Sequence, residues 1–315
     1  MTAILGGLAA AVMWATATLV SSRSSRMIGS RVVLAWVMIV GTIVGLPLSI
    51  VSGVPRDIPP GTLPLLLLAG VCYSAGLYVT YKALTIGKVS IVAPIVATEG
   101  AVGALIAVAL GDALSLVAAL LLALIAGGVV LSSIEPARPD VPAGDIELAA
   151  DALDGPARDD ARARIANHAA LLIDDAARTR RTVLLSVADA LIFGVGLVAA
   201  GKAASLIPPI WVATSTRVVG LAVVALPLVL QRRLVLPRKV VPLVVIAGIG
   251  EIVGSTASAW GSTYSIPITA VLGSQFAAIA AVVAFLFFGE RLSRTQVAGV
   301  ILIVGGVTAL AASSA

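Results

Sequence analysis

The sequence predicts an all-α membrane protein with ten transmembrane helices in two inverted five-helix repeats. Three observations support this prediction: an apolar composition, ten apolar stretches of membrane-spanning length, and a pattern of turns and glycines that recurs 178 residues later in the chain. Hydrophobic residues make up 59% of the 315 residues and charged residues only 12%, about half the charged share of an ordinary soluble domain. A soluble fold of this composition would have too few polar residues to cover its surface.

Each apolar stretch is about 20 residues long, the length needed to cross a hydrocarbon core of about 30 Å. The stretches are rich in Leu, Val, Ala and Ile and lack strand-like alternation, so they are predicted to be helices and not barrel strands. The ten predicted spans cover residues 3–21, 32–52, 63–82, 89–110, 114–133, 183–201, 207–230, 240–260, 266–288 and 295–313.

The second half of the chain repeats turns and glycines of the first half. Gly111, Leu114 and Ser115 recur as Gly289, Leu292 and Ser293, and the glycine pair 127–128 recurs as 305–306. Because each copy holds an odd number of spans, the second copy must enter the membrane in the opposite orientation. The predicted domains are a first repeat over 1–133, a soluble cytoplasmic insert over 134–182, and a second repeat over 183–315.

The insert has ten acidic residues and seven arginines and breaks the hydrophobic pattern. Its default interpretation is a solvated linker, with a short helix over 157–181 on the cytoplasmic face. His168, the only histidine, has no partner at metal-ligand spacing, so no metal site is expected here. We interpret the carboxylates of Asp112 and Glu290 in the repeated turns as helix caps.

Basic residues gather in the loops on one predicted side of the membrane. Those loops contain Arg23, Arg26, Arg31, Lys82, Lys88, Arg138, Arg178, Arg180, Arg181, Arg232, Arg233, Arg238, Lys239, Arg291 and Arg294, whereas the opposite side has only Arg56 and Lys202. This asymmetry follows the positive-inside rule, so both termini are predicted to be external. It also accounts for the net charge of +5 without a nucleic-acid partner. We expect a multi-pass protein of the cell (plasma) membrane.

Four ionisable side chains lie inside predicted spans: Glu99, Asp189, Arg217 and Glu251. A charge at the middle of a membrane helix costs at least about 2.5–3.5 kcal/mol, so such residues usually face a cavity or a partner. Glu99 and Glu251 lie near the middles of their spans. Burial favours the protonated form of a carboxyl group, so either residue could exchange a proton or pair with a cationic substrate. The alternative is that each locks two helices together.

Arg217 could pair permanently with Asp189 or Glu251, or could face an anionic substrate. Structural pairing is favoured because a guanidinium group does not lose its proton in proteins. Asp189 lies about two helical turns from the cytoplasmic edge of its span, where it could be only a vestibule residue.

Aromatic residues make up only 4% of the chain, so their positions are informative. Trp14, Tyr73 and Tyr78 lie deep in spans and are predicted to line a pocket, with Gln275 adding a hydrogen bond. Tyr73 is the repeat equivalent of Glu251, and polar residues at both positions indicate a wet site. Tyr81 and Trp260 lie near span ends and are predicted to be interface anchors.

No nucleophile elbow, phosphate loop or metalloprotease motif occurs in the sequence. We therefore expect neither an enzyme nor a cofactor, and the single Cys72 excludes an intramolecular disulfide. Two alternatives stay open: a membrane-embedded lipid-modifying enzyme that uses acids of the insert, and a flippase for lipid-linked substrates.

The sequence resembles the drug/metabolite transporter (DMT) superfamily, specifically its ten-helix EamA-type transporters. The resemblance lies in the two Gly-acid-x-Leu-Ser turns, the paired glycines, Trp14 within Val12–Ala15, the segments 83–84 and 92–94, and Arg217 early in its span. It implies export of small metabolites, amino acids or amphipathic drugs, by facilitated diffusion or in exchange for protons. The family is generally pictured with cytoplasmic termini, whereas the arginines of this chain predict external ones.

Overall fold

The computed structural model describes residues 1–87, 92, 95–132, 156–276, 279 and 294–313. Within these residues the regular elements are all helical, which confirms the predicted all-α class for this part of the chain. In chain order they are α1 (Thr2–Ile28), α2 (Ser30–Val51), α3 (Thr62–Ile86), α5 (Glu99–Ala109), α6 (Leu116–Ser132), α8 (Pro156–Ala204), α9 (Pro209–Gly220), a π-helical segment η1 (Leu221–Ala225), α10 (Leu226–Leu230), α11 (Val241–Ser262), α12 (Ile266–Gly273) and α14 (Arg294–Ser313).

Six described helices are long and apolar enough to cross a membrane. They cover Thr2–Ile28, Ser30–Val51, Thr62–Ile86, Arg178–Ala204, Pro209–Leu230 and Val241–Ser262. Three of the remaining predicted spans coincide with shorter apolar helices, Glu99–Ala109, Leu116–Gly128 and Val297–Leu310. The predicted span 266–288 begins with the eight residues of α12 and then passes outside the described residues. The chain is a multi-pass membrane protein, and the count of ten spans stays a prediction.

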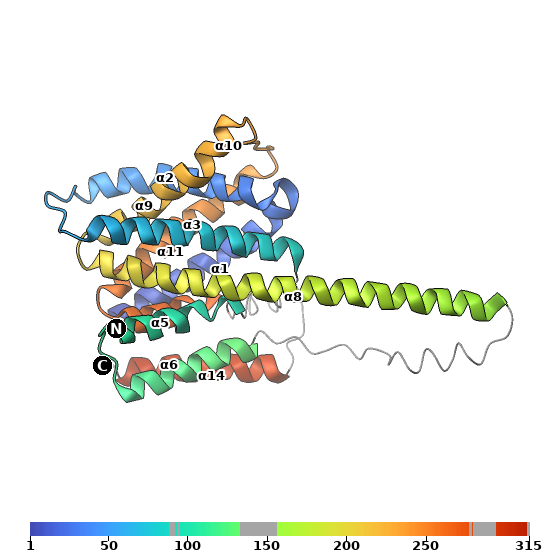
Figure 1. Cartoon of the computed structure of the whole chain (residues 1–315). Helices are drawn as coiled ribbons and strands as arrows, with labels where there is room; N and C mark the ends of the chain where they lie inside the picture. Colours follow the sequence, from blue (N-terminus) through green and yellow to red (C-terminus); the bar gives the residue numbers. More distant parts are fainter. Residues whose placement is uncertain (88–91, 93–94, 133–155, 277–278, 280–293, 314–315) are drawn as a thin grey trace.

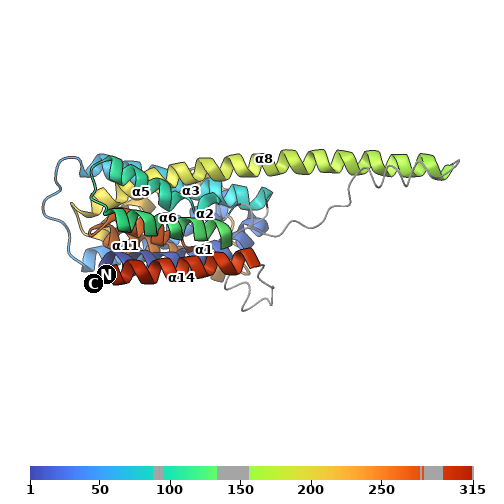
Figure 2. The same cartoon turned by 90° about the horizontal axis from the view of Figure 1, so that it is seen from below.

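Helix α8 joins the insert to the membrane-embedded bundle without a break. We predicted a separate short helix over 157–181, but the helix continues through Thr182 to Ala204. Neither Gly nor Pro occurs between Pro156 and Gly194, so nothing in this stretch ends the helix. The first half of α8 projects beyond the bundle (Figures 1 and 2).

The two ends of the bundle differ in charge. Figures 1 and 2 show both chain termini together at one end, and α8 projecting from the other. Most described basic residues predicted to share a side lie at or near the helix ends and turns of the α8 side: Arg23, Arg26, Arg31, Lys82, Arg232, Arg233, Arg238, Lys239 and Arg294. The others, Arg178, Arg180 and Arg181, lie within α8 at the start of its apolar, membrane-length part. The termini and the basic residues are therefore at opposite ends of the molecule.

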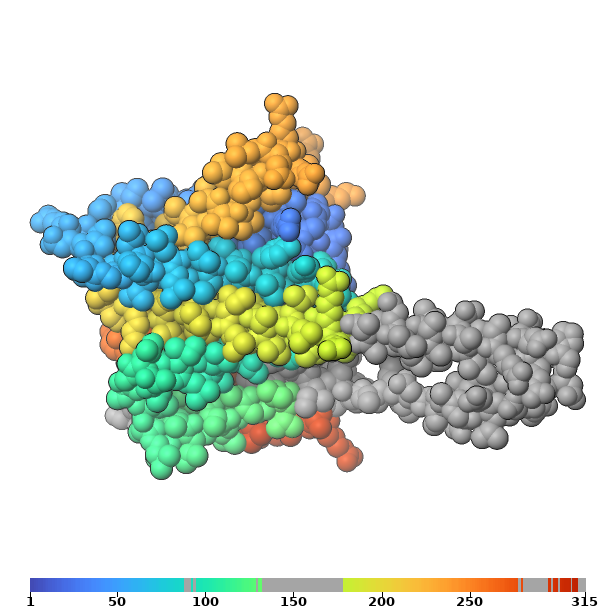
Figure 3. All heavy atoms as spheres, in the orientation of Figure 1, coloured from blue at the N-terminus to red at the C-terminus, as the bar shows by residue number. Residues whose placement is uncertain are grey.

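The sides of the bundle expose apolar side chains, as expected for helices in contact with lipid. Figure 3 shows α3 and the membrane part of α8 running side by side along one face. Their exposed apolar residues include Leu63, Leu67, Val71, Leu184, Val187, Leu191 and Val195. Such a surface would be unstable in water.

Neighbouring helices are matched between the two halves of the chain. Helix α1 packs on α11, and α3 packs on α8; likewise α12 packs on α1, and α5 packs on α8. Helices α2 and α9 pack on each other, as do α6 and α14. Small residues allow the close approach: a Cβ atom added to Gly6 of α1 would lie 2.6 Å from Gly261 Cα of α11.

The turn before α6 is not capped by the residue that the sequence predicted. Asp112 was interpreted as a helix cap, but its carboxylate forms an ion pair with Lys202 at the end of α8. The cap is made instead by Ser115, whose Oγ accepts a hydrogen bond from Ala118 N at 3.2 Å. Glu290 lies outside the described residues.

The paired glycines of α6 and α14 provide a matched test of packing. A Cβ atom at Gly128 would lie 2.9 Å from Gly299 O, and one at Gly306 would lie 2.6 Å from Ile125 Cγ1, whereas Gly127 and Gly305 face open space. We expect Gly128→Val to destabilise the protein by about 1–3 kcal/mol more than Gly127→Val, because only the former overpacks the contact. Thermal unfolding in detergent measures the difference.

Gly127→Val and Gly128→Val make the same change in helix propensity and in side-chain volume, so Gly127→Val is the control for Gly128→Val. Gly306→Val and Gly305→Val should repeat the contrast on α14. Equal unfolding temperatures within each pair would show that α6 and α14 do not pack through this contact.

Candidate functional site

Two small cavities adjoin each other at the centre of the bundle. The first has a volume of about 30 Å³, enough for about two water molecules. It is lined by Trp14, Thr18, Tyr73, Leu77, Thr80, Tyr81, Val96, Glu99, Phe193, Glu251 and Phe276. The second, of about 20 Å³, is lined by Trp14, Tyr73, Gly196, Leu197, Ala200, Gly201, Val212, Thr216, Ser255, Ser258, Ala259 and Ser262. Because Trp14 and Tyr73 line both cavities, the two cavities lie next to each other around these residues.

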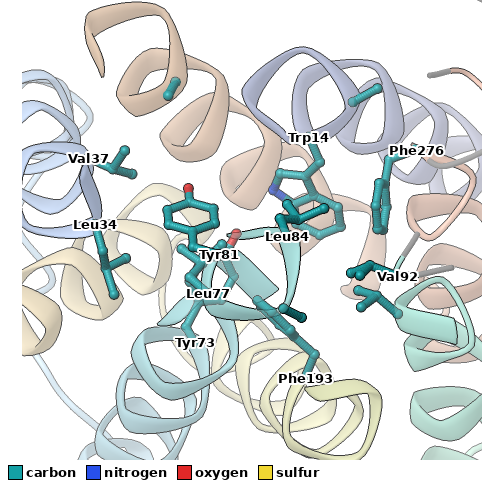
Figure 4. Packing of buried hydrophobic residues seen from close by; sticks show 14 of the residues in the cluster. Trp14, Leu34, Val37, Tyr73, Leu77, Tyr81, Leu84, Val92, Phe193 and Phe276 are labelled. Atoms are coloured by element: carbon teal, nitrogen blue, oxygen red, sulfur yellow. The ribbon is translucent and has the colours of Figure 1, made fainter. Parts of the chain in front are cut away.

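Close helix contacts hold the Trp14 ring in place. Cβ atoms at Gly254 of α11 and Gly273 of α12 would lie 2.8 Å and 3.1 Å from the ring, so the absence of side chains there makes room for the indole. The indole Nε1 is buried and has no hydrogen-bond partner among the described residues. Figure 4 shows Trp14 close to Tyr73, Tyr81, Leu77 and Phe276. A buried donor of this kind is available to a water molecule or a ligand.

A buried network around Arg217 joins α9, α11 and α3. The Arg217 side chain is 0% exposed. Its Nη2 donates to Glu251 O at 2.9 Å and to Ser255 Oγ, and lies 3.6 Å from Glu251 Oε2. Its guanidinium carbon lies 4.3 Å from the centroid of the Tyr73 ring, a cation–π distance. Of the two partners that the sequence left open for Arg217, the structure brings Glu251 into contact.

Tyr73 completes this network. Its hydroxyl donates to Glu251 Oε2 at 2.8 Å and lies 2.7 Å from Ser255 Oγ. Its ring packs edge-on against Phe193, with centroids 5.3 Å apart. Tyr73 and Glu251, which are equivalent in the predicted repeat, are thus hydrogen-bonded to each other.

The other two acids lie apart from the arginine. Glu99 is 4% exposed, lines the first cavity, and has no hydrogen bond or ion pair with any described residue. Asp189 is 0% exposed; its Oδ2 accepts a 2.6 Å hydrogen bond from Thr80, and its Oδ1 has no partner among the described residues. Thr80 lines the first cavity and so connects Asp189 to it.

Helices α5 and α12, which approach the cavity, are short. Glu99 is the first residue of α5, where the helix dipole favours a negative charge. Helix α12 ends at Gly273, just before Phe276. Interrupted helices that meet a central cavity are a common way to build transporter binding sites.

Not every residue proposed from the sequence lies at this centre. Tyr78 lies outside both cavities, beside Arg31 and Lys82 at the basic end. Gln275 is 2% exposed and its Nε2 donates to Val271 O within its own segment. Tyr81, predicted to be an interface anchor, is 1% exposed and lines the first cavity, so that prediction is wrong.

Sequence reasoning also missed several lining residues that helical spacing could have revealed. Leu77, Thr80 and Tyr81 follow the predicted residue Tyr73 at the spacing of one helix face. Ser255 lies four residues after Glu251 and therefore faces the same way. A helical projection centred on Tyr73 and Glu251 would have selected these residues.

Comparison with known proteins identifies the family. The model of the EamA-like transporter family matches residues 1–134 and 180–312. The chain belongs to the EamA-like transporter family. The resemblance to the DMT superfamily is therefore confirmed, and the protein is a membrane transporter of the DMT type.

One solved crystal structure, described only as that of a protein, matches with a TM-score of 0.69 and 19% sequence identity. The match covers 98% of this chain and 96% of the other, and at this identity it supports the fold alone. None of the curated proteins matches the sequence.

The buried ion pair of this EamA-like protein generates a stability prediction. Arg217→Met leaves Glu251 buried without its cation, so we expect a loss of about 3–5 kcal/mol in the free energy of unfolding. Adding Glu251→Gln removes the uncompensated carboxylate and should recover part of the loss. Thermal unfolding in detergent measures all three proteins.

Arg238→Gln is the control, because Arg238 is exposed and its loss should change stability by less than about 0.5 kcal/mol. If Arg217→Met were no more harmful than Arg238→Gln, the central network would not stabilise the fold.

Proposed function

We propose that the protein is a secondary transporter that exports small metabolites, amino acids or amphipathic drugs by alternating access, in exchange for protons. One observation carries the proposal: Glu99 faces a central cavity with no described partner, beside Trp14, Tyr73 and Glu251 from both halves of the chain. A carboxyl group among aromatic rings in the membrane interior suits both proton exchange and substrate binding.

The proposal includes two inverted repeats, and reciprocal contacts support them. Gly41 packs against Arg217 and Gly220 packs against Met38, so the same contact is made twice with the halves exchanged. The contacts of Gly76 with Phe193 and of Gly254 with Trp14 form another such pair. Equivalent residues of the two halves are 179 positions apart in the first two helices of each half and 178 positions apart further along the chain. A two-fold axis passing near Tyr73 and Glu251 would produce this pattern.

The two cavities also correspond under the repeat. Leu77 and Thr80 of the first cavity are equivalent to Ser255 and Ser258 of the second. Paired half-cavities on either side of one partition are what a carrier with two related gates requires. Each half-cavity would open to one side of the membrane in turn, with the rings of Trp14 and Tyr73 between them.

The volumes support a closed conformation between these two openings. Small-molecule sites usually have volumes of about 300–1,000 Å³, whereas the two cavities have about 30 and 20 Å³. A substrate of metabolite size would therefore enter only after the helices around Trp14 and Tyr73 separate. The unpartnered indole Nε1 of Trp14 would then donate to it.

The charge balance supports proton coupling. Three buried acids, Glu99, Asp189 and Glu251, surround the site, and Arg217 is the single buried cation among the described residues. Glu251 is paired with Arg217, whereas Glu99 and Asp189 have no ion pair with any described residue. A cationic substrate and protons would neutralise these two acids in turn during the transport cycle.

Transport in proteoliposomes tests the proposal. Vesicles containing a pH-sensitive dye are challenged with pooled amino acids, cationic drugs and polar metabolites. We expect a substrate-dependent proton flux that Glu99→Gln lowers at least about tenfold, because an amide cannot carry the proton. Glu251→Gln should also lower transport, through the loss of the ion pair with Arg217.

Asp57→Asn is the matched control, since Asp57 is an exposed acid outside the cavities. Substrate movement without proton flux, unchanged in both glutamate variants, would mean a passive carrier and would contradict the role of Glu99. Lipid movement in place of solute movement would favour the flippase alternative.

Thiol labelling in intact cells tests the proposed orientation, with external termini. In a Cys72→Ala background, Ile58→Cys places a thiol in the exposed loop between α2 and α3, and Val235→Cys places one in the loop before α11. A membrane-impermeant maleimide should label residue 58 in intact cells and residue 235 only after permeabilisation, because the arginine-rich end is expected inside. The opposite result would put the termini in the cytoplasm.

A further inference from the structure

A third cleft lies at the basic end of the bundle, away from the central cavities. It is formed by the turn between α1 and α2 and by the last turns of α3, and has a volume of about 280 Å³. Its lining residues are Gly29, Ser30, Arg31, Val32, Tyr78 and Lys82. Among the described residues, the lining of the cleft therefore contains two cations and no acid.

Both cations converge on one aromatic ring. The Arg31 guanidinium carbon lies 5.2 Å from the centroid of Tyr78, and Lys82 Nζ lies 5.9 Å from it. Arg31 Nε also donates to the Tyr78 hydroxyl at 3.2 Å, which uses one of its five donors. Neither cation pairs with a carboxylate of the described residues. Because both cations line this one cleft, an anion inside it would be attracted by two positive charges.

The walls of the cleft are fixed to each other before any ligand binds. Ser30 Oγ donates to Tyr81 O at 3.1 Å and so ties the start of α2 to α3. Gly29, with a φ of 87°, makes the turn that brings α2 back beside α1. Because α2 begins at Ser30, its first amide groups also face this end, where the helix dipole favours an anion.

We propose that this cleft binds a phosphate group, either of an anionic phospholipid headgroup or of a soluble phosphate compound. Arg and Lys together suit phosphate, because Arg offers a planar fork of donors and Lys a compact charge. Basic pockets between transmembrane helices at the cytoplasmic face bind anionic headgroups in other membrane proteins. The positive-inside rule accounts for basic residues at this end, but not for two of them facing one tyrosine ring.

Lipid retention by the full-length protein tests the proposal. Wild type is purified from detergent mixed with equal amounts of phosphatidylglycerol and phosphatidylcholine, and bound lipid is counted by native mass spectrometry. We expect wild type to retain phosphatidylglycerol selectively, and Arg31→Gln and Lys82→Gln each to lower that selectivity about fivefold. Arg26→Gln is the control, because Arg26 is an exposed arginine at the end of α1 that does not line the cleft.

A second arm separates the two sources of phosphate. Thermal unfolding of lipid-depleted protein is followed with inorganic phosphate and, separately, with vesicles of phosphatidylglycerol or phosphatidylcholine. Stabilisation by phosphatidylglycerol vesicles alone would identify the lipid headgroup, and stabilisation by inorganic phosphate as well, lost in Arg31→Gln, would identify a soluble phosphate site. The proposal would be overturned if wild type retained both lipids equally and inorganic phosphate did not stabilise it. It would also be overturned if Arg31→Gln and Lys82→Gln both kept the wild-type selectivity for phosphatidylglycerol.

Discussion

The buried guanidinium of Arg217 is the constraint on which the centre of this fold depends. Arginine keeps its charge in proteins, and at 0% exposure that charge must be met by groups of the protein. The carboxylate of Glu251, the hydroxyl of Ser255 and the ring of Tyr73 all contact it. Gly41 leaves the room the side chain occupies, since a Cβ there would lie 3.0 Å from Arg217 Cδ. This one side chain of α9 therefore contacts α2, α3 and α11.

Once Arg217 is paired with Glu251, the remaining acids have different surroundings. Asp189 is held by Thr80, whereas Glu99 faces the cavity without a described partner. A group that already has its cation gains little from binding another, whereas an unpaired carboxyl group in a low-dielectric cavity gains much. The paired acid therefore suits a structural role and the unpaired acid suits exchange with protons or substrate. The sequence slightly favoured Glu251 as the functional acid, whereas its pairing with Arg217 supports Glu99 for the proposed exchange.

The sequence was sufficient for the membrane class, the family and the residues nearest the centre. Burying a charge in lipid is costly enough that Arg217, Glu251 and Glu99 stood out by position alone. The sequence was insufficient where the direction of a side chain decides which site it lines. Tyr78 and Tyr81 are three residues apart on one helix, yet Tyr78 lines the basic cleft and Tyr81 lines the central cavity. The change from charged to apolar composition suggested two separate elements, although the absence of Gly and Pro between Pro156 and Gly194 was a signal that α8 continues from the insert into the membrane.

In the proposed repeat, equivalent positions of the two halves differ in chemistry, and this difference bears on how such a carrier would work. Equivalent positions hold Met38 and Arg217, Tyr73 and Glu251, and Tyr81 and Ala259. The first cavity thus has more aromatic and acidic lining, and the second has the hydroxyls of Ser255, Ser258 and Ser262. If each cavity opens to one side, the two open states differ in free energy, because the same ligand would meet different groups in each. That difference would set the ratio of the affinities on the two sides of the membrane.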